Sequence, residues 1–175
     1  MDIRDAGSDD LPAILAIYND VIATSTAVYS DTPATLDDRM AWWCARAGQG
    51  YPVLVATDAT GVIGFASFGD FRSWPGYRFS VEHSVHVRQD CRGKGIGTRL
   101  MMPLIERATA LGKHVMIAGV DADNAASLRF HERLGFERVA HFRQVGFKFG
   151  RWLDLVFLQR YLDVPAAARP SSSKE

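Results

Sequence analysis

Hydrophobic residues recur with two different periods along the chain, and each change of period marks a new element. In the N-terminal part, apolar positions recur with helical spacing after the capping residues Ser8 or Asp9, and again after a capping box at residues 35–38 (TLDD). Strand-like runs follow at 51–56 and 62–71, joined by a glycine turn. This pattern predicts two amphipathic helices followed by a β-hairpin.

The second half of the chain alternates strands with helices. A strand-like segment at 78–87 precedes a helical segment at 97–111, which Gly112 ends. A strand, a helix and two further strands are predicted at 114–119, 124–134, 136–146 and 150–160. Pro103 falls within the helical segment at 97–111, where it removes a backbone hydrogen bond unless the helix begins later.

No internal repeat occurs, so we expect one domain at residues 1–163, and we expect residues 164–175 (VPAAARPSSSKE) to form a mobile tail. With 175 residues, 47% of them hydrophobic, the chain is long enough to bury a core. Its net charge of zero offers no general attraction for nucleic acid or a membrane surface. The chain has no leader-like segment, no long apolar stretch and only two cysteines, Cys44 and Cys91, which predicts a cytoplasmic protein.

A glycine-rich segment at residues 88–97 (RQDCRGKGIG) connects the predicted strand at 78–87 to the following helix. Such a turn directs backbone N–H groups and the positive end of the helix dipole at one small volume that suits phosphate. The segment matches neither a P-loop, which needs Ser or Thr after Gly-Lys, nor a dinucleotide fingerprint, which needs glycine where Leu100 stands. It therefore either binds another phosphate ligand or only reverses the chain.

The motif formed by Arg92, Gly95 and Gly97 resembles the acyl-CoA pyrophosphate loop of the GNAT superfamily of N-acetyltransferases. A second signature of that superfamily, Asn-x-x-Ser followed by Leu-Gly-Phe, lies at residues 124–136. Further segments resemble the phosphinothricin and methionine sulfoximine N-acetyltransferases, at residues 32–33, 42–43, 69–76, 81–85, 114–118 and 145–155. The resemblance spans residues 3–162 and implies the mixed α/β sheet of the GNAT fold, acetyl-CoA as co-substrate and a homodimer.

The resemblance also implies which residues bind acetyl-CoA. The backbone of residues 85–87 would bond the pantetheine arm, and an N–H near Val85 would polarise the thioester carbonyl. Asn124 would bond the pantetheine or the sulfur region, and Ser127 would cap its helix or approach the cofactor. The predicted cofactor-binding residues are Val85, His86, Val87, Arg92, Gly93, Lys94, Gly95, Ile96, Gly97, Thr98, Asn124 and Ser127.

The catalytic candidates lie on the strand before the loop and on the helix at 124–134. Period-two alternation places Glu82, with Ser84 and His86, on one strand face and His83 on the other. Glu82 aligns with the general base of the phosphinothricin acetyltransferases, and a partly apolar cleft suits a carboxylate to that role; His83 is the weaker candidate for base or substrate binding. His131 stands where many GNAT enzymes carry a tyrosine that protonates the leaving thiolate, so it is either that acid or a hydrogen-bonding or packing residue.

The candidate acceptor site is the segment 71–77 (FRSWPGY), which carries Arg72, Ser73 and Trp74. A guanidinium can hold an α-carboxylate through two hydrogen bonds, and an indole can enclose a small side chain, although an ordinary exposed loop is the alternative. The resemblance implies that Lys148, in a second aromatic and cationic cluster, shapes the acceptor pocket near a dimer interface; core packing is its alternative. We therefore expect a small amino-acid analogue, acetylated on its α-amine by direct attack in a ternary complex, with methionine sulfoximine or phosphinothricin as best candidates.

We expect no metal, because His83 and His86 point to opposite strand faces, and because Cys44 and Cys91 have no ligand spacing. Neither cysteine lies in a recognisable nucleophile setting, so no covalent enzyme intermediate is expected. Two other functions stay open from the sequence. An acetyltransferase for a polyamine, an aminoglycoside or a protein N-terminus would keep the CoA loop without the carboxylate grip. A non-catalytic acyl-CoA-binding module would keep the loop without the base.

Overall fold

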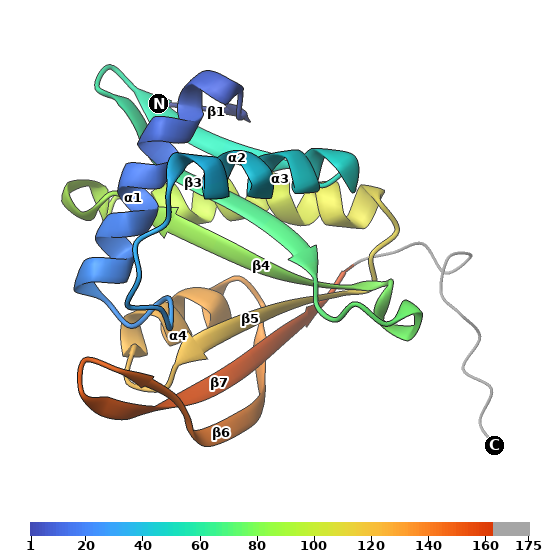
Figure 1. Cartoon of the computed structure of the whole chain (residues 1–175). Coiled ribbons are helices and arrows are strands. Elements are labelled where there is room, and N and C mark those ends of the chain that lie inside the picture. Colours follow the sequence, from blue (N-terminus) through green and yellow to red (C-terminus); the bar gives the residue numbers. More distant parts are fainter. Residues whose placement is uncertain (163–175) are drawn as a thin grey trace.

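The computed structural model describes residues 1–162, which form one mixed β-sheet with helices on both faces (Figure 1). The strands are β1 (Asp2–Asp5), β2 (Val53–Asp58), β3 (Gly61–Asp70), β4 (Ser80–Val87), β5 (Val115–Asp121), β6 (Glu137–Lys148) and β7 (Arg151–Tyr161). The α-helices are α1 (Leu11–Thr24), α2 (Leu36–Gly48), α3 (Ile96–Ala110) and α4 (Ala125–Arg133). In this part of the chain, no helix combines the length and the apolar character needed to cross a bilayer. The predicted tail at 164–175 lies outside the described residues.

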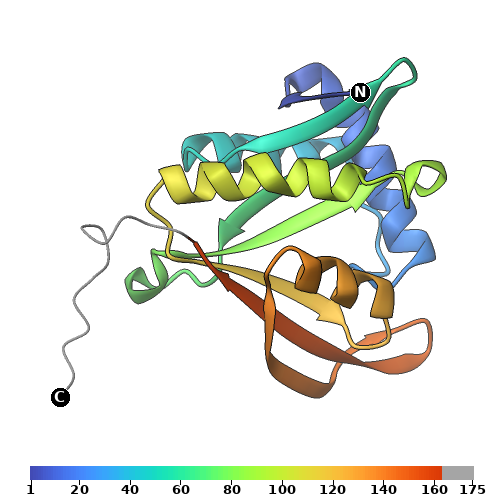
Figure 2. The ribbon, with the colours of Figure 1, turned by 180° about the vertical axis from the view of Figure 1, so that it is seen from behind.

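The strands are ordered β1-β2-β3-β4-β5-β7-β6, and all neighbours are antiparallel except β4 and β5. Helices α1 and α2 cover one face of the sheet, and α3 and α4 cover the other (Figures 1 and 2). On the first face, Leu11 and Ile14 of α1 pack against Val55 and Phe65 of the sheet. The mixed α/β fold that the family resemblance implied is therefore confirmed.

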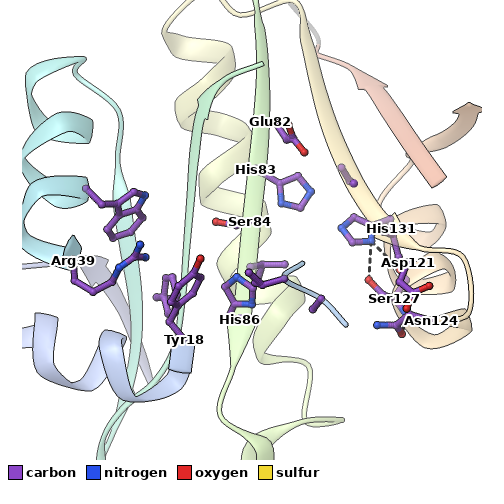
Figure 3. Close-up of a pocket in the computed structure, with 18 residues that line it drawn as sticks. Tyr18, Arg39, Glu82, His83, Ser84, His86, Asp121, Asn124, Ser127 and His131 are labelled. Carbon is purple, nitrogen blue, oxygen red and sulfur yellow. Dashed lines mark hydrogen bonds between the residues drawn. The ribbon is translucent and has the colours of Figure 1, made fainter. Parts of the chain in front are cut away.

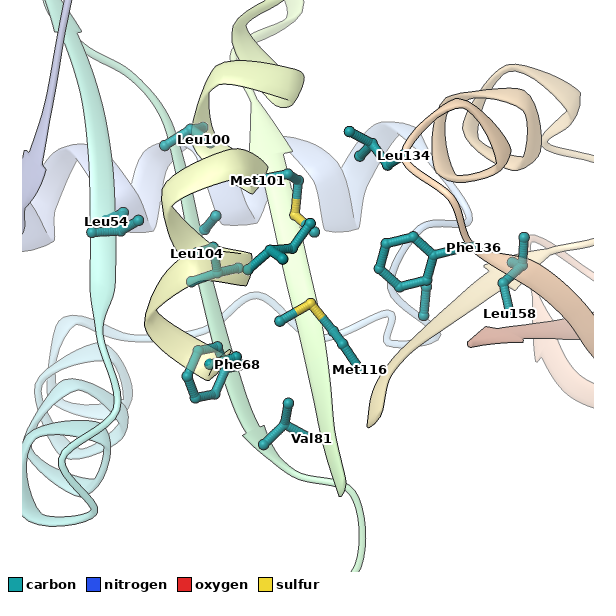
Figure 4. Close-up of a cluster of buried hydrophobic side chains, with 14 of the residues drawn as sticks. Leu54, Phe68, Val81, Leu100, Met101, Leu104, Met116, Leu134, Phe136 and Leu158 are labelled. Atoms are coloured by element: carbon teal, nitrogen blue, oxygen red, sulfur yellow. The ribbon is translucent and has the colours of Figure 1, made fainter. Parts of the chain in front are cut away.

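The larger core lies between α3 and the sheet (Figure 4). Leu100 and Leu104 are fully buried one helical turn apart, and they share this core with Phe68 and Met116 of the sheet. Burial of a leucine side chain contributes about 1.5–3 kcal/mol relative to exposure. This packing fixes α3 on the sheet, so the glycine-rich loop that precedes α3 is held beside the end of β4.

Strands β4 and β5 pair only at their first residues and then separate. Their parallel pairing covers Ser80 to Glu82 on β4 and ends where Glu82 faces Ile117. Beyond this point β4 continues to Val87 and β5 to Asp121 without pairing to each other. Because the two strands no longer bond one another, the backbone edges of residues 83–87 and 118–121 are left for other partners.

The helices and strands predicted from residue 51 onward are present with ends shifted by two residues or fewer, and the capping box at residues 35–38 is confirmed. The first two predicted helices are also present, but α2 continues to Gly48, and the N-cap of α1 is Asp10 instead of Ser8 or Asp9. Thr35 Oγ1 accepts a hydrogen bond from the Asp38 N–H at 3.2 Å, and Asp38 Oδ2 accepts one from the Thr35 N–H at 2.7 Å. The sequence analysis missed β1, because its four residues (DIRD) contain a single apolar side chain and therefore show no alternation.

Pro103 lies in the interior of α3, and the later helix start that the sequence left open does not occur. The helix begins at Ile96, one residue earlier than predicted. Proline has no N–H, so the carbonyl of Arg99 loses its helical donor. The burial of Leu100 and Leu104 on the same helix holds α3 together across this position.

Candidate active site

A cavity of about 320 Å³ opens where β4 and β5 separate (Figure 3). Residues 82–86 of β4 and residues 118–121 of β5 line its centre. One wall comes from Tyr18 of α1 and from Arg39 and Trp42 of α2. The opposite wall comes from α4 and its cap, through Asn124, Ser127 and His131. The cavity therefore reaches both faces of the sheet through the gap between the two strands.

A second cavity of about 450 Å³ adjoins the first, and Val85 and Ser127 line both. Seven other residues of its lining were predicted to bind the cofactor or lie in the same loop: Val87, Arg92, Gly93, Gly95, Ile96, Gly97 and Thr98. The sequence analysis missed Phe130 and Arg133 of α4, which complete the wall. The two GNAT signatures, which are separate in sequence, thus meet at one cavity.

The loop glycines have conformations and contacts that a side chain would disturb. Gly93 and Gly95 have φ angles of +75° and +76°, a region that residues with a Cβ rarely adopt. A Cβ on Gly97 would lie 3.2 Å from a ring carbon of Phe130, so its absence lets α3 and α4 approach closely. The glycines therefore give the loop a defined backbone conformation, in addition to letting it reverse the direction of the chain.

The loop and the helix start fit the diphosphate of acetyl-CoA. Gly95 is the N-cap of α3 and provides no side-chain acceptor, so the first N–H groups of the helix remain available to an anion. Arg92 Nε donates to the Val87 carbonyl at 3.1 Å, and Lys94 Nζ donates to the Asp90 carbonyl at 3.0 Å. These contacts fix both side chains, of which Arg92 lines the second cavity and Lys94 does not.

Glu82 is the last β4 residue that pairs with β5, so it lies where the gap between the two strands begins. Partial burial raises the pKa of its carboxyl group, and the positive charge of Arg72 opposes that rise. A Cβ on Gly119 would lie 3.1 Å from Glu82 Oε1, so the missing side chain on β5 leaves room for the carboxylate. Within the described residues, no hydrogen bond engages the Glu82 carboxylate. The carboxylate of Asp121, which also lines the cavity, instead accepts hydrogen bonds from the Thr26 hydroxyl and the Asp123 N–H.

His131 and His83 face each other, with ring centres 5.1 Å apart. His131 Nδ1 lies 2.8 Å from the Ser127 carbonyl, which can only accept, so Nδ1 carries the hydrogen. Burial lowers the pKa of His131 and lowers that of His83 well below its usual value. His131 Nε2 and both His83 ring nitrogens are buried without a partner in the described part of the chain. Both rings are therefore neutral near pH 7, and His131 presents a lone pair at Nε2.

The alternation predicted for β4 is confirmed, because the His86 and His83 rings pack on opposite faces of the sheet. The His86 ring packs against Tyr18 and Phe65, at centroid distances of 5.9 and 5.2 Å. Burial and the charges of Arg39 and Arg92 lower the pKa of His86 to about 4. Sequence reasoning missed Arg39 as a site residue; the signal was its position three residues before Trp42, which puts both on one face of α2.

The predicted acceptor loop lies outside the walls of both cavities. Arg72 stacks its guanidinium over Phe71 at 4.4 Å, and only its effect on the pKa of Glu82 links it to the site. Ser73 is exposed, and Trp74 is 74% exposed, because the Pro75–Tyr77 turn carries this segment away from the sheet. Within one chain, therefore, the structure does not bring Ser73 and Trp74 to the cavity.

Lys148 is fully buried and does not reach the cavity. Its Nζ donates to the carbonyls of Ile22, Ser25 and Val28, at 2.6, 2.7 and 2.8 Å. All three ammonium hydrogens are thereby used, so Lys148 has no donor left for an acceptor molecule. Its contacts instead fix the α1–α2 connection, of which Ala27 and Val28 line the cavity.

Helix capping, one of the two roles predicted for Ser127, is performed by Asn124. Asn124 is the N-cap of α4, and its side-chain oxygen accepts from the Ser127 N–H at 3.0 Å. The capping role therefore belongs to Asn124, not to Ser127. Ser127 lies where the two cavities meet, and its hydroxyl is 3.4 Å from His131 Nδ1.

Comparison with known proteins places this geometry in a family. The model of the acetyltransferase (GNAT) family matches residues 14–136. The L-methionine sulfoximine/L-methionine sulfone acetyltransferase of Pseudomonas paraeruginosa is 58% identical over 95% of this chain and 97% of its own length. The phosphinothricin N-acetyltransferase of Alcaligenes faecalis is 38% identical over 96% of this chain and 86% of its own length. The structure of yncA from Salmonella typhimurium with its cofactor acetyl-CoA superposes with a TM-score of 0.93, at 48% identity, covering 98% of both chains.

The chain belongs to the GNAT family of acetyltransferases. It is an enzyme that uses acetyl-CoA. The second cavity is lined by the N-terminus of α3 and by glycines with positive φ, which suit a phosphate ligand. In residues 1–162, no group of three His, Cys, Asp or Glu side chains is arranged to hold a metal ion.

Proposed function

We propose that the enzyme acetylates the α-amine of small amino acids whose side chains carry oxygen on sulfur or phosphorus: methionine sulfoximine, methionine sulfone and phosphinothricin. The attack is direct, within a ternary complex. The observation that carries this proposal is the half-buried carboxylate of Glu82 at the junction of the β4–β5 gap, facing a cavity that adjoins the predicted acetyl-CoA site. The printed activities of the relatives at 58% and 38% identity supply the acceptor class.

Glu82 accepts the proton that the attacking amine must lose. Its carboxylate has no hydrogen-bond partner in the described residues, and its raised pKa brings its basicity closer to what proton transfer near neutral pH requires. Bound acetyl-CoA supplies the activated acetyl group. The free β4 edge at residues 85–87 supplies backbone N–H donors for the thioester oxygen and the pantetheine arm, and Arg92, Gly93, Lys94, Gly95, Ile96, Gly97 and Thr98 hold the diphosphate.

Of the two roles left open for His131, we propose the hydrogen-bonding one. A general acid must carry a proton at Nε2, but the Ser127 carbonyl engages Nδ1–H and burial disfavours the doubly protonated ring. Nε2 has no partner among the described residues, so it is free to accept a hydrogen bond from a ligand group in the gap. The leaving thiolate then takes its proton from solvent in the second cavity.

The decisive experiment is a thiol-release assay with methionine sulfoximine, methionine sulfone, phosphinothricin, their decarboxylated analogues, a polyamine and an aminoglycoside. We expect turnover of the three amino acids and little turnover of the decarboxylated analogues. Faster turnover of the polyamine or the aminoglycoside would contradict the proposed acceptor class. Acetyl-CoA binding without turnover of any amine would indicate a non-catalytic binding module.

We further propose that the enzyme is a cytoplasmic homodimer. The β6–β7 hairpin exposes several aromatic side chains, with Phe147, Phe149 and Trp152 each more than half exposed at 54%, 55% and 61%. Such a patch is typical of an interface, and a second copy of the chain is the partner that the family resemblance implies. Light scattering after gel filtration tests this proposal; a monomer at micromolar concentration would contradict it. Cell fractionation tests the cytoplasmic location, which the free thiols of Cys44 and Cys91 support.

A further inference from the structure

Arg39 is a cation without an acidic partner on the wall of the first cavity. Its guanidinium carbon lies 4.2 Å from the ring centre of Tyr18 and 4.9 Å from that of Trp42. No carboxylate of residues 1–162 forms an ion pair with it, and its Nε is buried without a hydrogen-bond partner. In Figure 3 the side chain extends from α2 toward β4, beside Tyr18.

This arrangement prepares the guanidinium for a ligand. Stacking on two aromatic rings fixes the plane of the fork while leaving its edge N–H groups without protein acceptors. An oxygen-bearing ligand that reaches the terminal N–H groups of Arg39 forms charge-assisted hydrogen bonds there, which are stronger than bonds between neutral groups. Aromatic rings around the charge also exclude water, which strengthens each bond.

The position of Arg39 separates it from the reacting amine. Glu82 and His86 share one face of β4, with Ser84 between them. Tyr18 contacts both the His86 ring and the Arg39 guanidinium, so Arg39 stands at the His86 end of this face. An amino acid with its amine beside Glu82 therefore extends its side chain along β4 toward Arg39, since both residues line the first cavity.

We infer that Arg39, clamped between Tyr18 and Trp42, binds the oxygen atoms at the end of the acceptor's side chain and thereby selects sulfone, sulfoximine and phosphinate groups over a plain thioether. This inference rests on the proposed function, because it names the group that reads the acceptor at that site.

Methionine sulfone and methionine test the inference directly, because they differ only by the two oxygens on sulfur. In R39M, kcat/KM for the sulfone falls about 10-fold or more relative to kcat/KM for methionine, as expected for loss of a charged hydrogen bond. R39K, which keeps the charge but not the fork, gives an intermediate ratio. Where methionine turns over too slowly, calorimetric dissociation constants of the two amino acids, with coenzyme A present, give the same comparison.

Arg78 supplies the matched control, because its guanidinium stacks 4.5 Å from the ring centre of Phe79 and lines neither cavity. R78M keeps the wild-type ratio. An unchanged ratio in R39M, or an equal loss for both amino acids in R39M and R39K, overturns the inference while the proposed function stands. A wild-type enzyme that acetylates no amino acid overturns the proposed function instead. Thermal melting verifies that each variant is folded.

Discussion

The Nζ of Lys148 lies 2.8 Å from the carbonyl oxygen of Val28, a residue 120 positions earlier in the chain. Val28 lines the first cavity, and Lys148 stands at the end of β6. The same ammonium bonds two further carbonyls, of Ile22 and Ser25, so one buried charge fixes the connection between α1 and α2. The wall of the first cavity therefore depends on Lys148, a residue that does not line this cavity.

Replacing Lys148 with methionine should weaken acceptor binding more than donor binding. The variant leaves three carbonyls without their donor, which destabilises the fold by about 3 kcal/mol and loosens the segment that carries Ala27 and Val28. We expect the acceptor KM to rise about 10-fold, while the acetyl-CoA dissociation constant stays within about twofold. Steady-state kinetics, calorimetry and urea unfolding measure these three quantities.

Lys113 offers the control, because its Nζ also joins distant groups, the Tyr51 hydroxyl and the Arg78 carbonyl, away from both cavities. K113M should lose stability without a change in acceptor KM. Gly146→Ala tests the same wall from another side, since its Cβ would overlap the ring of Tyr29 in the α1–α2 connection. An acceptor KM that stays at the wild-type value in both K148M and G146A would show that this connection does not shape the acceptor site.

Substitution of Glu82 by glutamine should lower kcat about 100-fold or more and remove the acidic limb of the pH–rate profile. Burial raises the pKa of Glu82, so the wild-type rate falls as the pH drops through a value above the ordinary 4.5, where the base becomes protonated. Acetyl-CoA affinity should be unchanged. A variant that keeps the wild-type rate would assign the base to another group.

The raised pKa of Glu82 also affects the stability of the folded protein, and the effect is opposite in sign to that of an ion-paired carboxylate, whose pKa is lowered. A raised folded-state pKa means that the ionised form of Glu82 is disfavoured in the folded protein. Glu82 therefore lowers the free energy of unfolding when the pH is above its folded-state pKa, and has no such effect when the pH is below its unfolded-state pKa. E82Q should therefore unfold at slightly higher urea concentration than wild type at pH 7, and the difference should vanish at pH 4. A less stable E82Q at pH 7 would contradict the burial argument.

Nuclear magnetic resonance should find His131 neutral and protonated at Nδ1 at pH 7. The Ser127 carbonyl fixes that tautomer at 2.8 Å, and burial lowers the pKa of the ring. Glutamine at this position retains a group that can accept a hydrogen bond, so kcat of H131Q should fall less than 10-fold. A loss of 100-fold or more, together with a lost alkaline limb in the pH–rate profile, would restore the general-acid role.

Alanine at Gly95 should weaken acetyl-CoA binding, because this N-cap has a φ of +76° that costs a residue with a Cβ about 1–2 kcal/mol. Gly112, at the other end of α3, has a similar φ of +70° and provides the matched control. Both variants should lose similar stability in urea, but only G95A should raise the acetyl-CoA dissociation constant. Equal affinities in the two variants would exclude the loop as the diphosphate site.

Local sequence was sufficient for the parts of the fold and site that depend on chain neighbours. The capping box at Thr35 and Asp38 satisfies donors within one helical turn, and the face alternation of β4 follows from backbone pleating alone. The glycines at 93 and 95 were predictable for the same reason, because positive φ angles and a helix N-terminus are local properties. The shape of the loop was thus contained largely in ten consecutive residues, whereas the close approach of Gly97 to Phe130 depends on the packing of α4.

The acceptor side was predicted less well because its residues meet only through tertiary packing. Arg39 reaches the cavity because α2 packs beside α1 and Tyr18; its spacing from Trp42 indicates a shared helix face but not that this face lines a cavity. Lys148 resembled a substrate-binding cation in sequence, yet three carbonyls from a distant segment take all its hydrogens. Trp74 resembled a pocket wall and is instead exposed.

The sequence by itself determined the α-helices, the strands other than β1, the glycine turn and the family, because these follow from periodicity, capping and short motifs. Only the tertiary structure decided which side chains share a cavity and which proton each can carry. The pKa of Glu82 and the tautomer of His131 depend on burial and on one carbonyl contact, and these exist only after β4, β5 and α4 have packed together.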